Sequence, residues 1–543
     1  MKKLSTKWLL LPALLLLTSC SRQPRQALEL LPADTLLVVR LPDPAAAAGH
    51  LDGLLERLAQ GPARLFLSQF RKELLRRLGF DPRNAEQWRR LGVDPAAGLT
   101  VGLLKDGQAV VVLGVTDRAA LRKTLAARMK ELAAADQSSS QQVSGVEVTT
   151  LSARVGTGSM ARLRMAFAGR LLLLAGPAVS ADRLAALAGQ EREASLAAAG
   201  WFDELRERLP RKTDLLLVAN PGAASIPASA GSRTAAWPGR GAALALDFGS
   251  GALAARLFVG LEAGRAGRFR ALVEQVPDTH LEGKLPASSL LVLKLRADPR
   301  KLLGELGALQ PERARELQER GKRLEKRLGR EFLAATIDNL TGNLVLGIGL
   351  TARDSLGRLA GGEGAGADVD RLEQEAWLLA WAELRQPQLF RQLLADLLRK
   401  VGEGFPGKQH RLGPLEVTEI TTPQGRHLSL LLAGNLAGLC LGKSCQQLAA
   451  GCLAGKAGNL AASLAKPARA QLNRANLASG LLRLDRLLEF VRHLDVSALG
   501  SAGSGLKALL QLAIAVLGKL GELGLVVEPV SAGGLLQVNL WLK

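Results

Sequence analysis

Residues 31–40 read Leu-Pro-Ala-Asp-Thr-Leu-Leu-Val-Val-Arg, and residues 285–294 read Leu-Pro-Ala-Ser-Ser-Leu-Leu-Val-Leu-Lys. In each stretch a proline turn precedes an apolar run rich in leucine and valine, which predicts a turn leading into a β-strand. Asp-Pro follows each strand, at Asp43-Pro44 and Asp298-Pro299. Aspartate caps helices and proline favours the first helical position, so we expect a helix to begin at each Asp-Pro.

Further matches follow these two stretches in the same order. They pair residues 145–149 with 414–418, 168–171 with 433–436, and 180–186 with 444–450. The last of these pairs puts Ser180 and Ser444 where a serine can cap a helix. Because the matches keep both order and register, we interpret them as an internal repeat. The predicted domains are two similar tandem modules, residues 29–265 and 281–543.

Short alternating apolar segments joined by tight turns predict that each module is an antiparallel β-sheet packed with helices, an α+β fold. We expect a helix over residues 117–134 and a helix pair that ends near residue 209. Small and polar residues predict internal loops at 135–145, 221–241, 361–370 and 497–505. The module boundary falls within 262–284, where residues 269–276 have a helical pattern. In the first module the expected strands are 99–104, 109–115, 146–151, 161–167, 171–174, 215–218, 243–248 and 252–259.

Residues 1–19 have the order of a secretory signal peptide, with basic residues first, an apolar stretch over 8–17 and small residues before Cys20. The apolar stretch is too short to cross a bilayer, which takes about 20 residues. Leu17-Thr18-Ser19-Cys20 resembles the lipobox of bacterial lipoproteins. The resemblance implies a palmitate-type lipid anchor on Cys20, a lipidated tether over 20–28, and, with serine at position 21, an outer-membrane location facing the periplasm. An ordinary secretory signal is the alternative.

The chain is strongly basic, with a formal net charge of +21, and it contains no tyrosine. Such a charge favours anionic lipids or acidic envelope polymers as partners. Nucleic acid is disfavoured, because the chain is exported and has no nucleic-acid recognition motif. One basic cluster has helical spacing and could contact an anionic surface, or could be a solvated face interleaved with glutamates. Its members are Lys322, Arg323, Lys326, Arg327 and Arg330.

Three cysteines remain after Cys20: Cys440, Cys445 and Cys452. An odd number permits at most one internal disulfide, for which Cys440 and Cys445 are a conceivable pair. The favoured role of these three cysteines is that of small, buried apolar side chains. Zinc binding is disfavoured, because the spacing matches no zinc motif.

No motif in the sequence identifies a reaction, and we predict no catalytic residues, no cofactor and no metal. Gly442-Lys443-Ser444 matches only the end of a phosphate-binding loop, because alanine occupies position 437, where that loop requires glycine. A serine helix cap accounts for this fragment. The five histidines are scattered, without metal-ligand spacing.

The Leu-Pro-Ala-Asp-Thr opening at residues 31–35, the strand leading to Asp-Pro and the lipoprotein signal together resemble an uncharacterised family of secreted and lipid-anchored bacterial proteins, a domain of unknown function. That resemblance implies no catalytic residues. The leading hypothesis is a membrane-anchored, non-enzymatic binding or scaffold protein of the cell envelope. The alternative is a periplasmic carrier of lipid or another apolar ligand, which requires an apolar site of several hundred Å³. A cryptic hydrolase is less favoured.

Overall fold

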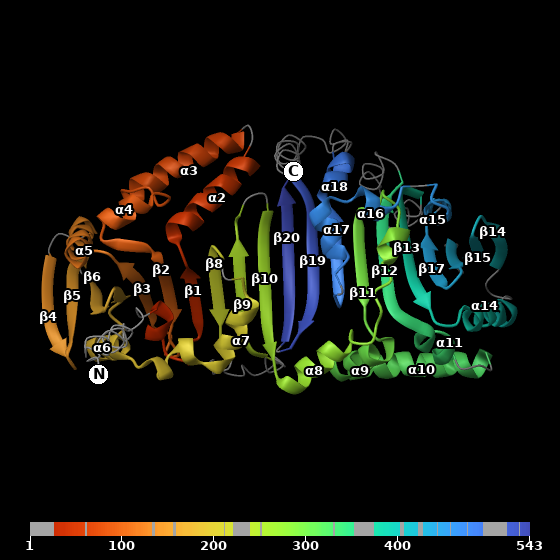
Figure 1. Cartoon of the computed structure of the whole chain (residues 1–543), viewed down its shortest axis with the longest axis horizontal. Coiled ribbons are helices and arrows are strands. Elements are labelled where there is room, and N and C mark those ends of the chain that lie inside the picture. The colour runs from red at the N-terminus through yellow and green to blue at the C-terminus, as the bar shows by residue number, and fades with distance from the viewer. Residues whose placement is uncertain are drawn as a thin grey trace, which may run out of the picture. The chain divides into compact units, whose positions relative to one another are not determined.

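The computed structural model (Figure 1) describes residues 26–59, 62–132, 136–155, 159–210, 212–220, 239–249, 252–328, 332–351, 374–401, 407–421, 427–442, 444–456, 458–474, 476–491, 519–531 and 533–542. The chain divides into two compact units. Unit 1 comprises Met1–Ala48, Leu78–Arg206 and Thr213–Pro227, and unit 2 comprises Gly49–Arg77, Glu207–Lys212 and Ala228–Lys543. Helices and antiparallel strands make up both units, so the predicted α+β class is confirmed.

Unit 1 contains one continuous antiparallel sheet in the order β8-β1-β2-β3-β7-β6-β5-β4. Its elements are η1 (Ala27–Leu30), β1 (Leu37–Leu41), the start of α2 (Pro44–Leu58), α4 (Ala85–Arg90), β2 (Val93–Leu103), β3 (Ala109–Val115), α5 (Arg118–Leu132), β4 (Asp136–Val143), β5 (Val146–Val155), β6 (Ser159–Ala168), β7 (Leu171–Ala175), α6 (Ala181–Gly189), η2 (Arg192–Ala194), η3 (Leu196–Ala198), most of α7 (Gly200–Arg208) and β8 (Leu215–Ala219).

Helix α5 covers the β5-β6-β7 part of this sheet. Leu121 of the helix packs with Leu151, Met165 and Leu172 of the three strands. Side chains alternate between the two faces of a strand, so neighbours such as Leu173 belong to the opposite face. Helix α6 contacts β5 and β6, and its Leu184 and Leu187 are buried.

Unit 2 contains an antiparallel sheet in the order β9-β10-β20-β19-β18-β11-β12-β13-β17-β16-β15-β14. Its elements are most of α2, α3 (Pro62–Leu78), β9 (Gly239–Asp247), β10 (Ala252–Leu261), α8 (Ala263–Ala271), η5 (Leu281–Lys284), β11 (Leu291–Arg296), α9 (Pro299–Leu309), α10 (Pro311–Leu328), α11 (Phe332–Ala335), η6 (Ile337–Asn339), β12 (Leu340–Leu350), β13 (Ala376–Leu384), α14 (Pro387–Val401), β14 (Gly407–Leu412), β15 (Leu415–Thr421), β16 (His427–Ala433), β17 (Leu436–Leu441), α15 (Cys445–Leu453), α16 (Leu460–Ser463), α17 (Lys466–Leu472), β18 (Ala478–Arg483), α18 (Leu484–Val491), β19 (Leu520–Val530) and β20 (Gly533–Leu542).

Two tryptophans of β13 anchor the core of unit 2. Trp377 and Trp381 are 2% and 0% exposed, and they pack with residues of η5, β12, β17 and α15. A Cβ atom at Gly438 of β17 would lie 2.6 Å from the Trp381 ring, and one at Gly349 of β12 would lie 2.4 Å from the Trp377 ring. Glycine at both positions therefore makes room for indole rings, which are the largest apolar side chains of the core.

The predicted Asp-Pro helix starts are confirmed. Asp43 Oδ1 accepts hydrogen bonds from the backbone N–H groups of residues 45 and 46 at 3.0 and 2.9 Å. Asp298 Oδ1 accepts the equivalent bonds from residues 300 and 301 at 3.0 and 3.1 Å. Pro44 and Pro299 are the first residues of α2 and α9. In each place one side chain satisfies two amide groups that the helix itself leaves unpaired.

Three local predictions were wrong. Most of the expected loop 135–145 is strand β4, whose residues 138–140 are serines. The strand has no apolar face, and it is held by its backbone ladder with β5 and by the contact of Ser140 Oγ with Thr149 Oγ1 at 3.0 Å. The segment 269–276, which has a helical pattern, is helical only as far as Ala271, the last residue of α8. Ser180 caps α6, but Ser444 does not cap α15, because it adopts a helical conformation instead of the extended one that a cap requires.

Candidate functional site

The predicted site residues lie partly on α10 and partly outside the described residues. Lys322, Arg323 and Lys326 are exposed on α10. Arg323 comes within 3.9 Å of Glu319, whereas Glu325 accepts a hydrogen bond from the backbone of residue 333. The interleaved glutamates are thus not all paired with these cations. Cys20, Arg330 and the side chain of Arg327 lie outside the described residues.

A second candidate site, which the sequence analysis did not identify, is one face of the unit 2 sheet. From β10 across to β13, the side chains that point to this face are all apolar, and we call it the apolar face. Its members are Leu253, Ala255, Leu257, Leu536, Val538, Leu540, Leu523, Leu525, Gly480, Leu482, Leu291, Leu293, Leu344, Leu346, Ile348, Leu378, Ala380 and Ala382.

The two faces of this sheet differ in their exposure to solvent. On the apolar face, Leu293, Leu344 and Leu525 are 45%, 39% and 39% exposed. On the opposite face their sequence neighbours Val292 and Val345 are both 0% exposed. Leu293 and Leu525 flank Gly480, which has no side chain to separate them. The result is a continuous apolar surface that water reaches.

Helices α8 and α9 border one end of the apolar face. Leu302 of α9 packs with Leu295 of β11 and Val527 of β19, in a cluster that also includes Val273 beyond the end of α8. Figure 1 shows α9 and α10 along the ends of strands β11 to β13. Helix α10 packs against α9, α11 and α14, so its exposed cations lie in the same helical layer as α9.

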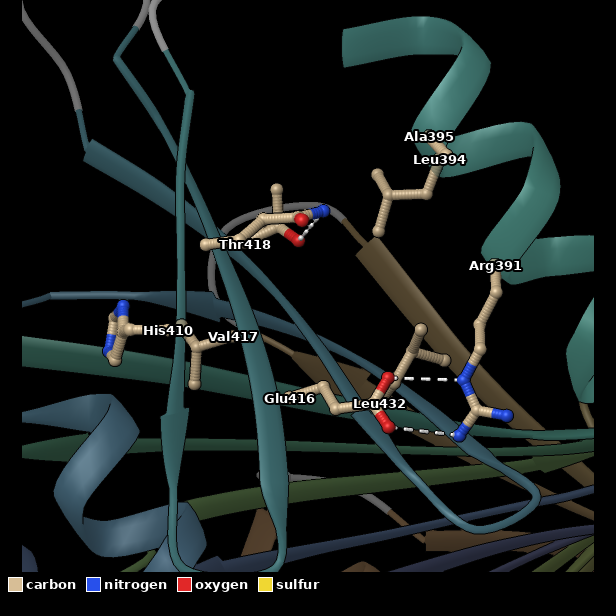
Figure 2. A pocket seen from close by; sticks show the side chains of 9 residues that line it. Arg391, Leu394, Ala395, His410, Glu416, Val417, Thr418 and Leu432 are labelled. Atoms are coloured by element: carbon tan, nitrogen blue, oxygen red, sulfur yellow. Dashed lines mark hydrogen bonds and ion pairs between the residues drawn. The ribbon is translucent and has the colours of Figure 1, made fainter.

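A pocket of about 400 Å³ lies between helix α14 and strands β14 to β16 (Figure 2). Leu394 on the helix and Leu432 on β16 are buried apolar residues of its lining. Thr418, which is 4% exposed, adds a hydroxyl group. The remaining lining residues are Arg391, Ala395, Gln409, His410, Glu416 and Val417.

An ion pair forms one wall of the pocket. Arg391 donates from Nε and Nη2 to the Glu416 carboxylate at 3.0 and 3.2 Å, in the two-bond geometry that makes such pairs strong. Gln409 Nε2 donates to Thr418 Oγ1 at 3.4 Å. By strand alternation, His410 points to the other face, and Figure 2 shows it on the far side of the strands from Arg391. His410 therefore lines the pocket with its backbone.

Cys440 and Cys445 belong to the buried core of unit 2, and Cys452 is buried on α15. Cys440 and Cys445 form a disulfide, so the two act as a cross-link and not as separate buried thiols. Cys452 is free and buried, and burial raises the pKa of its thiol. Among the residues that the structure describes, no group of three or more His, Cys, Asp or Glu side chains could hold a metal ion.

The phosphate-loop fragment has a structural explanation. Gly442 has a φ of +94°, and a Cβ atom there would lie 2.3 Å from the carbonyl oxygen of Ala376. Only glycine fits this position, so the residue permits close approach of the backbone to β13. In the described part of the chain, no helix is long and apolar enough to cross a bilayer.

No protein-family model and no curated protein matches the chain. Two solved structures are similar to part of it, crystal forms I and IV of TP0453, both at 9% sequence identity. Form I covers 45% of this chain and 80% of TP0453 with a TM-score of 0.25. Form IV covers 43% and 79% with a TM-score of 0.23. TM-scores this low establish neither a shared fold nor a shared function.

Proposed function

We propose that this protein is a non-enzymatic lipoprotein of the bacterial cell envelope, anchored through Cys20, that binds the acyl chains of lipids on its apolar face. The observation that carries the proposal is the exposure of Leu293, Leu344 and Leu525 within a face made only of apolar residues. Soluble proteins rarely expose a continuous apolar patch larger than a few hundred Å², and such patches mark binding surfaces.

The chemistry of the face favours acyl chains over a protein partner. Protein interfaces are only about 56–65% apolar, and they carry about one hydrogen bond per 100–200 Å². The apolar face has no side chain that donates or accepts a hydrogen bond, and its backbone groups are used in the strand ladders. Acyl chains require no such groups.

The charge of the border fits an anionic headgroup. Lys322, Arg323 and Lys326 are exposed on α10, which follows α9 at the edge of the face. Basic residues near a lipid surface each contribute about 1 kcal/mol toward binding anionic lipids. Anionic phospholipid is therefore the expected ligand. The expected location is the periplasmic side of the outer membrane, because serine follows Cys20.

We further propose that the fold consists of two tandem modules, 29–265 and 281–543. The strand order β8-β1-β2-β3-β7-β6-β5-β4 of unit 1 is matched by β18-β11-β12-β13-β17-β16-β15-β14 of unit 2, which supports a duplication. The two compact units do not coincide with these modules. Strands β9 and β10 fall within the first module, but they belong to unit 2.

Matching hydrogen bonds at the two proline turns also support the duplication. Thr35 Oγ1 donates to the carbonyl oxygen of Pro32 at 2.7 Å, and Ser289 Oγ donates to that of Pro286 at 2.6 Å. Just before the turns, the carbonyl oxygens of residues 31 and 285 accept from the backbone N–H groups of residues 196 and 460 at 2.7 and 2.8 Å.

Mass spectrometry of the full chain, extracted from its own envelope, tests the proposed ligand. We expect anionic phospholipid in stoichiometric amount. Leu293→Glu combined with Leu525→Glu should remove it, because both charges would lie among acyl chains. Leu65→Glu is the matched control, since Leu65 is 68% exposed on α3 and outside the apolar face. Equal lipid content in all three folded proteins, or a bound protein in place of lipid, would overturn the assignment.

The anchor has its own test. Cys20→Ala should release the chain from membranes, because attachment depends on buried acyl groups at that thiol. Unchanged membrane retention of this variant would rule out the lipid anchor without affecting the ligand assignment.

A further inference from the structure

The pocket beneath α14 has a counterpart in unit 1. There Arg122 of α5 donates to Glu147 of β5 at 2.7 Å. In unit 2, Arg391 of α14 pairs with Glu416 of β15. The partners are 25 residues apart in both pairs. The same helix-to-strand ion pair therefore occurs in both units.

The hydroxyl groups behind the two ion pairs also correspond. Thr149 contacts Ser140 at 3.0 Å, and Thr418 accepts from Gln409 at 3.4 Å, and the partners are nine positions apart in the sequence in each case. Both threonines are buried, at 6% and 4% exposure. The polar walls of the two sites are thus alike.

The sites differ in what fills them. In unit 1 the ring of Phe167 occupies the site, with the guanidinium carbons of Arg118 and Arg122 at 5.1 and 5.2 Å from its centroid. Phe167 pairs with Leu172 across β6 and β7, and the corresponding pair on β16 and β17 is Leu432 with Ala437. The position of the phenyl ring is therefore held by a smaller side chain in unit 2, beside the space of about 400 Å³.

We infer that this pocket binds an aromatic group of a second ligand, stacked against Arg391 between Leu394 and Leu432. Arg391 directs its Nε and Nη2 atoms to Glu416, which leaves the flat face of the guanidinium group for a ring. Phe167 shows that this environment accepts an aromatic ring against an arginine that is already paired with a glutamate.

The pocket is large enough for more than the ring. Ligand sites commonly measure about 300–1,000 Å³, and an aromatic ring takes only part of this one. Thr418 and the exposed Gln409 can hydrogen-bond to a polar substituent near the mouth. The expected ligand class is therefore a ring that carries a hydroxyl or carbonyl group.

Phenol and cyclohexanol, tested against the full chain by titration calorimetry and ligand-observed NMR, separate aromatic from merely apolar binding. We expect saturable phenol binding that is about tenfold tighter than cyclohexanol binding, the size of a partly desolvated contact between a cation and a ring. Arg391→Gln should reduce that preference, because it removes the cation that would face the ring. Equal affinity for the two probes, or no saturable phenol binding, would overturn the inference.

Exchanging the two side chains provides matched variants. Leu432→Phe should abolish saturable phenol binding by filling the pocket as Phe167 fills its counterpart, and Phe167→Leu should create a second phenol site. If Leu432→Phe does not fold, Ala395→Phe blocks the same pocket from an exposed helix position. Wild-type phenol binding in a folded Leu432→Phe or Ala395→Phe variant would contradict the assignment.

This site is independent of the apolar face. Leu293→Glu with Leu525→Glu should leave phenol binding unchanged, and Leu432→Phe should leave bound phospholipid unchanged. The two proposals can therefore fail separately.

Discussion

Truncating one leucine on each face of the unit 2 sheet tests whether the apolar face is open. Leu481 of β18 is 1% exposed, and Leu525 of the neighbouring strand β19 is 39% exposed. Leu481→Ala removes packed atoms and leaves a cavity, which costs about 2–5 kcal/mol. Leu525→Ala removes partly hydrated atoms and leaves no closed cavity. With full burial of a leucine worth about 1.5–3 kcal/mol, the loss at this half-open position is about 1 kcal/mol.

A lysine at each of these two positions should widen the difference in stability between the variant at the buried position and the variant at the exposed one. Leu525→Lys leaves the ammonium group within reach of water, so we expect a cost close to that of Leu525→Ala. Leu481→Lys puts an unpaired charge into the core, which costs several kcal/mol and should prevent folding of unit 2.

The assay is urea unfolding of the full chain followed by tryptophan fluorescence. Trp377 and Trp381 are buried reporters in the unit 2 core that Leu481 helps to form. Because a chain of several units need not unfold in two states, the unfolding midpoints are compared and not extrapolated energies. If Leu525→Ala lowers the midpoint as much as Leu481→Ala does, the apolar face is packed against other groups and cannot bind acyl chains.

Three further outcomes are expected. Replacing Cys440 and Cys445 by alanine should lower the free energy of unfolding by about 2 kcal/mol, since their disulfide closes a short loop with a sequence separation of 5. A reducing agent should then lower the unfolding midpoint of the wild type but not that of the double variant. Cys452 should resist thiol alkylation until the chain is unfolded, because burial raises its pKa and excludes the reagent; rapid labelling of the native protein would contradict this. Burial also raises the pKa of Glu522 above 4.5, so the ionised carboxylate destabilises the fold at neutral pH and protonation relieves the cost as the pH falls through the raised pKa. Glu522→Gln should therefore raise the melting temperature at pH 7, and that gain should shrink in acid; a gain independent of pH would exclude this explanation.

Local chemistry made the module openings predictable. A proline turn, an apolar run and Asp-Pro act within about ten residues of one another, and the strands and the caps by Asp43 and Asp298 appear where these residues place them. Strand β4 was missed because serine and glutamine give it no apolar period, and its structure depends on a neighbouring strand. Ser444 was predicted to cap α15, but its backbone is helical where the chain turns beside the Cys440–Cys445 disulfide.

The pocket was partly visible in the sequence. Matching residues 168–171 with 433–436 sets Phe167 against Leu432, so the aligned halves already contain a large-to-small difference. The sequence does not show whether neighbouring side chains fill the space that the smaller Leu432 leaves. That depends on how α14 lies over β15 and β16, where the Arg391–Glu416 ion pair joins the helix to the strand next to Leu432.

The apolar face shows a different limit of sequence reasoning. Residues 291–293 read Leu-Val-Leu and residues 344–346 read Leu-Val-Leu, so apolar side chains occupy both faces of β11 and β12. This pattern is typical of strands covered on both sides. In unit 2 the core covers one side, as the full burial of Val292 and Val345 shows, while Leu293 and Leu344 remain exposed. Since leaving such a surface in water is unfavourable at about 25 cal/mol per Å², the sequence pattern favours a covering layer, and the proposed acyl chains would provide one without a hydrogen-bonding partner from the protein.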